Sequence, residues 1–380
     1  MNEGFVAMEK TNRTLVVKIG SSTLVDESHR IDESYLESLA DQVVRARELG
    51  WNTVIVSSGA IACGLRALGL EKRPTDIPSL QAAASIGQSA FAAAYANAFA
   101  PHGIITSSVL LTRRDTADRT AYLNARATIG RLLELGVVPI VNENDTVSIE
   151  QIKFGDNDTL AALVASLIEA DLCIIMSDID GLYDANPDKD PNAKLIARVE
   201  VITPEIMGAA GGSGSAVGSG GMVTKIKAAR VLMAAGIPMV IAAGTRADVI
   251  VDAVAGKPVG TLFAGERKAH SITPRKLWIA LGDSVKGAVV VDEGAKNALV
   301  NRGSSLLAVG IAEVASRFDE GDIVDVKDKA GLVIARGRVA FSSDEVALAC
   351  GRTSVQLSEN RLLAPLAERA VIHRDELIVF

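Results

Sequence analysis

Short runs of Val, Ile and Leu alternate with helical patterns along the first two thirds of the chain. The runs cover residues 14–19, 52–58, 103–111, 137–145, 172–178 and 237–244. They are almost continuously apolar, which is typical of strands covered on both faces. The helical pattern after the first run begins at Asp32, a favourable N-cap, and ends at Gly50. This alternation predicts an α/β fold over residues 10–265, with a mainly parallel sheet sandwiched by helices.

The pattern changes at residues 264–276, which we interpret as a linker. Beyond it, short apolar runs surround one small helical stretch. Residues 277–380 are therefore predicted to form a second, small β-rich domain.

Composition and charge exclude several classes of protein. The net charge of −7 and the pI near 5.3 argue against a nucleic acid or an anionic membrane as the main partner. The segment 1–14 contains acidic residues and no apolar core, so it is not a signal peptide, and no apolar stretch reaches the ~20 residues of a membrane span. Cys63, Cys173 and Cys350 are far apart and form no metal-ligand pattern. We expect free thiols in a cytoplasmic protein and no metal-ligating residues.

Polar residues follow several of the predicted strands, and ligands of open α/β sheets bind beyond the carboxyl ends of strands. Lys18 lies inside the first apolar run. It either meets an anion or reaches solvent from an edge strand, because an unpaired buried ammonium group is costly. Gly20, Ser21 and Ser22 follow it and offer unobstructed backbone N–H groups to a phosphate.

Three later segments offer further candidates. Ser58 and Gly59 follow the second strand, where they could hold a carboxylate or phosphate, or simply form a tight turn. The segments NEND (142–145) and FGDND (154–158) concentrate amides and carboxylates. They are either solvated loops or a pocket for an amino acid, with acids for its ammonium group and amides for its carboxylate. Asp158 starts a helical pattern and could be its N-cap or could hold two lysines in position.

The segment 208–225 contains seven glycines and ends at Lys225. It could be a flexible linker, but it lies inside the α/β region and leads directly into a helix, an arrangement that binds phosphate through amides and the helix dipole. Neither GxxxxGK[ST] nor a GxGxxG after the first strand is present. The combination indicates phosphoryl transfer: the chain offers two lysines, two glycine-rich turns and clustered Asn and Asp, and no obvious nucleophile–base pair. In phosphoryl transfer the protein mainly positions the reactants and neutralises charge.

These motifs in this order closely resemble the amino acid kinase family. The resemblance rests on VVKIGSS, VSSGAIACG, VPIVNENDTVS, FGDNDTLAALVA, SDIDGLYDANP, GSGGMVTKIKAA and GTLF, over residues 14–263. The tail, with VVVDEGAKNAL, RGSSLL and HRDEL, resembles the PUA domain that many relatives carry. Together the two resemblances cover the chain apart from its first residues.

The resemblance implies ATP-dependent phosphorylation of the γ-carboxylate of L-glutamate, the first step toward proline. It implies catalytic roles for Lys18, Lys225 and Asp158. Glutamate-binding residues would be Ser58, Gly59, Asn142, Asp145, Asp156 and Asn157. Nucleotide-binding residues would be Lys18, Gly20, Ser177, Asp178, Ser219, Gly220, Gly221, Met222, Val223, Thr224 and Lys225. Because the γ-carboxylate is already ionised at neutral pH, no general base is required. The two lysines, Mg²⁺ and the loop amides would offset the repulsion between substrates.

The resemblance also implies a dimer or tetramer and a hand-off of the labile product to a glutamyl-phosphate reductase. The nearest alternatives are relatives that phosphorylate acetylglutamate, aspartate or a nucleotide. An RNA-binding protein is an alternative of another class, because PUA domains often serve RNA enzymes. Residues 276–380 hold 13 Lys and Arg against 15 Asp and Glu, a net charge of −2. An RNA-binding module is expected to be basic, so nucleic acid is the less favoured partner.

Overall fold

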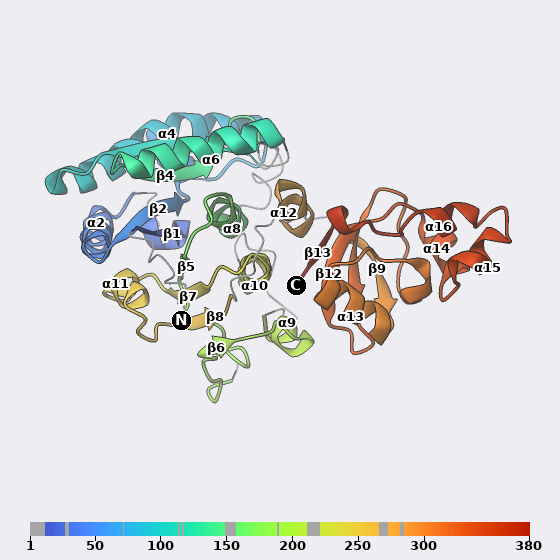
Figure 1. The fold of residues 1–380 in the computed structure, drawn as a ribbon. Helices are drawn as coiled ribbons and strands as arrows, with labels where there is room; N and C mark the ends of the chain where they lie inside the picture. Colours follow the sequence, from blue (N-terminus) through green and yellow to red (C-terminus); the bar gives the residue numbers. More distant parts are fainter. Residues whose placement is uncertain are drawn as a thin grey trace, which may run out of the picture.

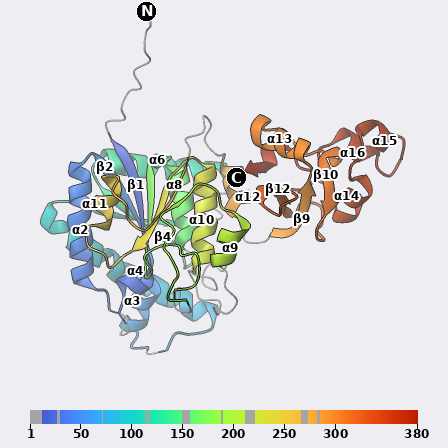
Figure 2. The same cartoon turned by 90° about the horizontal axis from the view of Figure 1, so that it is seen from below.

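The computed structural model describes residues 12–26, 30–70, 72–112, 115, 118–148, 157–187, 190–210, 221–265, 273–281 and 285–380. Its strands form two sheets, one of eight strands and one of five. We call residues 12–265 the first module and residues 285–380 the second module. Figures 1 and 2 show the second module beside the first, with helix α12 between them.

The first module is built on a sheet with the strand order β3-β4-β2-β1-β5-β7-β8-β6. Its strands in that order are Thr106–Leu111, Val138–Glu143, Trp51–Ser57, Arg13–Ile19, Leu172–Ser177, Met239–Ala243, Thr261–Phe263 and Arg198–Val199. Neighbouring strands are parallel except for β7 and β8, which are antiparallel. The prediction of a mainly parallel sheet is confirmed.

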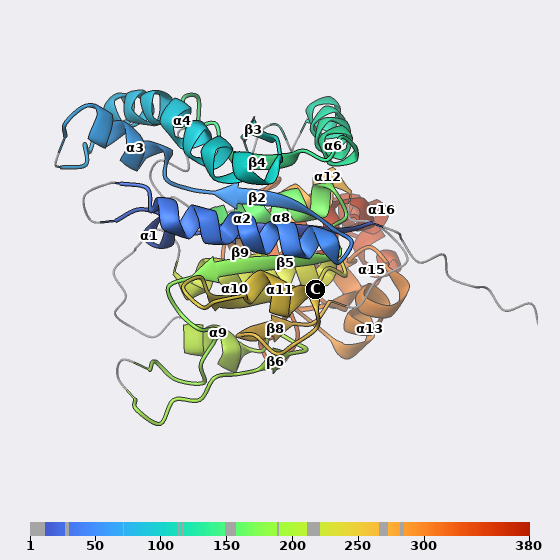
Figure 3. The same ribbon diagram turned by 90° about the vertical axis from the view of Figure 1, so that its left-hand side faces the viewer.

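Helices cover both faces of this sheet, so its strands are apolar on both sides. Helices α2 and α4 pack on one face, with α11 beside α2, and α6, α8 and α10 pack on the other. Figure 3 looks onto the face with α2 and α11. Along β1, Leu15 and Val17 point toward α2, whereas Val16 points toward α8. Lys18 follows Val16 by two residues and so shares its face, because side chains alternate along a strand.

The helices of this module and the helix that follows it differ widely in length. They are α1 (Ser21–Leu24), α2 (Glu33–Glu48), α3 (Ala60–Ala67), α4 (Ile77–Phe99), η1 (Ala100–His102), α6 (Arg119–Glu134), α8 (Asn157–Leu167), α9 (Pro204–Ala210), α10 (Met222–Ala234), α11 (Val249–Val254) and α12 (Pro274–Leu281). None of the described helices combines the length and hydrophobicity needed to cross a bilayer.

Local signals fix the ends of several elements. Asp32 caps α2 by accepting a hydrogen bond from the Tyr35 amide at 2.9 Å, and Gly50 follows the helix with φ +83°. Both ends of this helix are as predicted. The apolar run at 103–111 becomes a strand only from Thr106, because Gly103 is in the left-handed region, with φ +67°, where it ends η1.

Helices α3 and α4 approach so closely that two glycines are required. A Cβ on Gly64 would lie 1.8 Å from the Ala83 carbonyl oxygen, and one on Gly87 would lie 1.9 Å from that of Ala60. Real Cβ atoms do not come this close to backbone oxygen. The contact holds the Ala-rich α4 against α3, which starts at the end of β2.

The second module is a sheet with the strand order β10-β9-β11-β12-β13. Its elements are β9 (Val285–Val291), α13 (Glu293–Arg302), η2 (Ala308–Gly310), β10 (Ile311–Val314), β11 (Ile323–Lys327), β12 (Val333–Arg338), α14 (Ser343–Ala349), α15 (Ser354–Ser358), α16 (Ala364–Glu368), η3 (Arg374–Glu376) and β13 (Leu377–Val379). The expectation of one small helix was wrong. Helices α14 to α16 are short, and two of them begin with a capping box at Ser342 and Thr353.

We predict that Gly87→Ala destabilises the first module by about 1–3 kcal/mol, because α3 and α4 must separate to admit a methyl group. Gly130→Ala is the matched control. Gly130 lies inside α6 with no atom within 4 Å of the added Cβ, so this change should raise stability by up to about 1 kcal/mol. Thermal unfolding of the two variants measures both effects. Equal shifts in the melting temperature would contradict the role given to the α3–α4 contact.

Candidate active site

The polar residues singled out in the sequence gather at one edge of the first sheet. Strands β1, β2, β4, β5 and β7 are mutually parallel, so their carboxyl ends meet at this edge. Strand β1 pairs with β2 on one side and with β5 on the other. Strands β1 to β4 lie on one side of the boundary between β1 and β5, and strands β5 to β8 lie on the other. The strand order therefore reverses between β1 and β5, and ligands of open α/β sheets bind at such a point.

Lys18, Asp158 and Lys225 form a buried ionic cluster at this point. Lys18 Nζ lies 2.8 Å from Asp158 Oδ1, and Lys225 Nζ lies 3.3 Å from Asp158 Oδ2. The three residues are 6%, 0% and 3% exposed. Strand β1 is central in the sheet, so the alternative of an edge-strand Lys18 was wrong. Two ammonium groups share one carboxylate, which leaves the cluster well suited to a further anion.

Asp158 lies within the first turn of α8, not at its N-cap position. Burial alone would raise the pKa of its carboxyl group, but the charges of Lys18 and Lys225 and the hydrogen bond from Thr224 Oγ1, 2.8 Å from Oδ2, outweigh it. The pKa of Asp158 is therefore below its ordinary value. The carboxylate stays ionised and holds the two lysines, which is the second of the two roles predicted for it.

An amide and hydroxyl cluster adjoins the ionic cluster, because Asn157 precedes Asp158. Asn157 Nδ2 lies 3.0 Å from the Ser57 carbonyl oxygen, 2.7 Å from Ser58 Oγ and 3.2 Å from Asn142 Oδ1. The ends of β2, β4 and α8 thus meet at one side chain. Gly59 forms the turn between β2 and α3 with φ +130°, a conformation that favours glycine.

Two residues of this cluster were missed by the sequence analysis. Tyr95 donates a hydrogen bond from its hydroxyl to Ser57 Oγ at 2.7 Å, and Gln88 Oε1 accepts one from Asn142 Nδ2 at 3.4 Å. Both residues lie on α4, seven positions apart and hence on one helix face. The sequence contained a signal for these two residues, because they are polar residues that share one face of an otherwise Ala-rich helix.

Asp145 lies just beyond β4 and is half-buried. Burial raises the pKa of its carboxyl group to about 6, and the nearby charge of Arg73 lowers it only in part. Arg73 was not among the candidate residues, because nothing distinguishes a single arginine in a polar loop. Asp145 is therefore a carboxylate whose charge changes near neutral pH.

The candidate nucleotide residues lie beside the ionic cluster. A Cβ built on Gly20 would be 3.8 Å from Lys18 Nζ, and Ser177, 5% exposed, ends the neighbouring strand β5. Ser177 Oγ donates to Asp178 Oδ1 at 2.9 Å, and the Ser177 carbonyl accepts from Gly244 N at 2.7 Å.

The end of the glycine-rich segment also lies at the ionic cluster, because it forms the first turn of α10. Gly221 is the N-cap of α10, and the turn contains Met222, Val223, Thr224 and Lys225. The candidates Asp156, Ser219 and Gly220 lie outside the described residues.

Within the described ranges, no group of three or more His, Cys, Asp or Glu side chains is arranged to hold a metal ion. Asp158 already contacts two lysines and Thr224. Mg²⁺ commonly binds through one or two carboxylates and substrate phosphates and not through a cage made only of protein ligands. Cys63, Cys173 and Cys350 are free, as expected.

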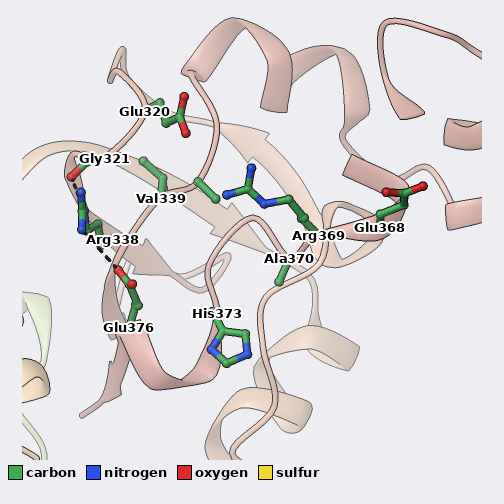
Figure 4. Close-up of a pocket in the computed structure, with 10 residues that line it drawn as sticks. Glu320, Gly321, Arg338, Val339, Glu368, Arg369, Ala370, His373 and Glu376 are labelled. Carbon is green, nitrogen blue, oxygen red and sulfur yellow. Dashed lines mark hydrogen bonds and ion pairs between the residues drawn. The ribbon is translucent and has the colours of Figure 1, made fainter. Parts of the chain in front are cut away.

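A separate cavity of about 640 Å³ lies in the second module, and Figure 4 shows its lining. The lining residues are Glu320, Gly321, Arg338, Val339, Ala340, Glu368, Arg369, Ala370, His373 and Glu376. Arg338 donates to the Gly321 carbonyl at 3.1 Å and faces Glu376 at 4.0 Å, while Arg369 stacks on Phe341 at 5.3 Å. These charges have structural partners, so we place the chemistry in the first module.

Comparison with known proteins agrees with this placement. The sequence model of the amino acid kinase family matches residues 13–243, and that of the PUA domain matches residues 287–359. The chain is 45% identical to the glutamate 5-kinase of Geobacter sp. (strain M21) over 372 residues, covering 97% of this chain and 98% of the relative. It is 45% identical to that of Geobacter sulfurreducens over 97% of both chains. Against that of Moorella thermoacetica it is 43% identical, over 97% of this chain and 96% of the relative.

We predict that Asp158→Asn lowers the free energy of unfolding by about 3–5 kcal/mol, because it leaves two buried ammonium groups without their carboxylate. Asp248→Asn is the control, since Asp248 pairs with Arg45 where both side chains are 47% exposed; it should cost about 1 kcal/mol or less. Denaturant unfolding of both variants measures the difference. A loss for Asp158→Asn no larger than that of the control would contradict the buried cluster.

Proposed function

The chain belongs to the amino acid kinase family, and we propose that it catalyses the ATP-dependent phosphorylation of the γ-carboxylate of L-glutamate. The relatives that match it along nearly its whole length are named glutamate 5-kinases. The observation that carries the proposal is the pair of adjoining clusters at the start of α8. Asp158 holds two lysines for a phosphoryl group, and Asn157 belongs to the amide and hydroxyl cluster, whose polar groups suit an amino acid.

The reaction needs little beyond positioning and charge. An oxygen of the γ-carboxylate attacks the γ-phosphorus of ATP, the bond to the bridging oxygen of the β-phosphate breaks, and ADP leaves. The carboxylate is already ionised, so no proton has to be removed. Lys18 and Lys225 stabilise the charge on the transferred group, and Asp158 keeps both ammonium groups in place.

The remaining site residues divide between the two substrates. L-Glutamate is bound by Ser58, Gly59, Asn142, Asp145, Asp156 and Asn157. ATP is bound by Gly20, Ser177, Asp178 and the segment 219–225, the end of which is the first turn of α10. Mg²⁺ arrives on the phosphates of ATP and neutralises part of their charge.

Asp145 favours glutamate over acetylglutamate as the acceptor. Its carboxylate suits a free ammonium group, which acetylglutamate lacks. A homo-oligomer and transfer of the acyl phosphate product to a reductase stay predictions of the family resemblance.

The acceptor is tested with MgATP, hydroxylamine and one of three acids: L-glutamate, N-acetylglutamate or L-aspartate. Hydroxylamine converts an acyl phosphate into a hydroxamate, which we expect with glutamate alone. Hydroxamate from another acid would overturn the assignment of the glutamate-binding residues. No hydroxamate from any of the three would overturn the proposed reaction.

The Lys225→Ala variant should keep the fold and lose most turnover in the same assay, because the ammonium group of Lys225 acts mainly on the transition state.

The pH dependence of kcat/KM for glutamate tests Asp145. The pKa of this residue is about 6, so below pH 6 the free enzyme loses the charge that attracts the substrate ammonium group. We expect kcat/KM to fall about tenfold per pH unit on the acid side, because kcat/KM reports ionisations of the free enzyme.

The Asp145→Asn variant is the control for this profile. It should have a raised KM for glutamate and no acid limb near pH 6. An acid limb at the same pH in this variant would assign the ionisation to another group.

A further inference from the structure

Helix α12 joins the two modules at the helices that hold the ionic cluster. It packs against α8 and α10 on one side and against β12 and β13 on the other. Leu277 and Ile279 of α12 are 1% and 0% exposed. They belong to one hydrophobic cluster that also includes Leu163 of α8, Ile226 of α10 and Ile378 of β13. The second module therefore shares its core with α8 and α10. In Figure 1, α12 lies between these two helices and the second module.

A cation–aromatic contact reinforces this junction. The ring of Phe380 has the guanidinium carbon of Arg230, from α10, at 5.4 Å and that of Arg336, from β12, at 5.9 Å. Arg336 is anchored in turn, since its Nε donates to Asp325 Oδ1 and its Nη1 to the Ala280 carbonyl, both at 2.8 Å. Ala280 lies in the last turn of α12, where carbonyl groups lack helical partners. Strand β12, helix α12 and helix α10 thus meet at Phe380.

The contact acts on the helix that presents Lys225. Helix α10 runs from Met222 to Ala234, so Arg230 is five residues beyond Lys225. That is a rise of about 7.5 Å along the helix axis. Hydrogen bonds between successive turns link the residues of a helix, so a contact that fixes Arg230 also restrains the turn with Thr224 and Lys225. Both residues contact Asp158 of α8, and α8 is held by the same α12.

We propose that Phe380, Arg230 and Arg336 form a clamp that positions α10 against α8. Through α10, the clamp sets the distance from Lys225 to Asp158. It also sets the position of the first turn of α10 relative to the nucleotide phosphates. The three residues are positioning residues, since none of them belongs to the site itself. The inference rests on the proposed function to the extent that MgATP binds at this turn.

Binding of the non-hydrolysable analogue AMP-PNP with Mg²⁺, measured by calorimetry on the full chain, tests the clamp. We expect the Phe380→Ala and Arg230→Gln variants each to raise its Kd about three- to tenfold, the range of one partly buried cation–aromatic contact. The double variant should show little more than the larger single effect, because both changes remove the same contact. The KM for glutamate should stay within about twofold, because the amide cluster does not include α10.

Arg369→Ala is the matched control. It removes a stacking contact of similar geometry, 5.3 Å from the Phe341 ring, between two residues of the second module, neither of which contacts Phe380 in the cation–aromatic pairs described above. Its Kd should equal that of the unmodified chain. A mere loss of folded protein would lower the number of binding sites and leave Kd unchanged, so the two effects separate. Phe380→Leu replaces Phe380→Ala if the latter does not fold.

Three outcomes would overturn the clamp, and they are distinguishable. If the unmodified chain binds the analogue and the folded Phe380 and Arg230 variants bind it equally well, the clamp is wrong and the proposed function stands. If the unmodified chain does not bind the analogue, the proposed function fails and the clamp fails with it. A Kd that rises equally in Arg369→Ala would also reject the clamp, because the effect would then not depend on α10.

Discussion

The sharing of one buried carboxylate between two lysines is the interaction on which the rest of the site depends. Lys18 and Lys225 come from elements more than 200 residues apart in the sequence, and both are almost fully buried. Burying either ammonium group alone would be costly, so Asp158 must lie between them. The fold meets this requirement, because β1 lies in the centre of the sheet, α8 packs against β1, and α10 packs beside α8. An excess of positive charge is thereby held where a phosphoryl group would be transferred.

The start of α8 connects the two halves of the site through consecutive residues. Side chains one position apart on a helix point about 100° away from each other. Asn157 can therefore join the end of β2 and Asn142, while Asp158 turns toward the lysines. A shift of α8 would disturb both clusters at once. Glutamate and the transferred phosphoryl group would be aligned by one helix, which suits a reaction that depends mainly on positioning.

The second module makes its contact with the first at these same helices. Its sheet packs on α12, and α12 packs on α8 and α10. Arg275 of α12 also pairs with Glu376 of the second module. The module is acidic and matches the PUA domain. Through α12 it supports the two helices that carry Asp158 and Lys225.

The sequence by itself determined six of the eight strands of the first sheet, the bounds of α2 and most of the candidate residues, because apolar runs, an N-cap at Asp32 and polar residues after strands are local signals of burial and termination. It also showed the family resemblance. Only the tertiary structure decided that β1 is central, that β8 runs antiparallel to β7, that Tyr95 and Gln88 support the amide cluster, and that Phe380 meets Arg230. The physical reason is that periodicity reports how an element is buried, whereas its neighbours are chosen by packing between segments distant in the chain. Lys18 illustrates the difference. The apolar run showed that buried residues flank it, but only the structure showed that the carboxylate of Asp158 stabilises its buried ammonium group.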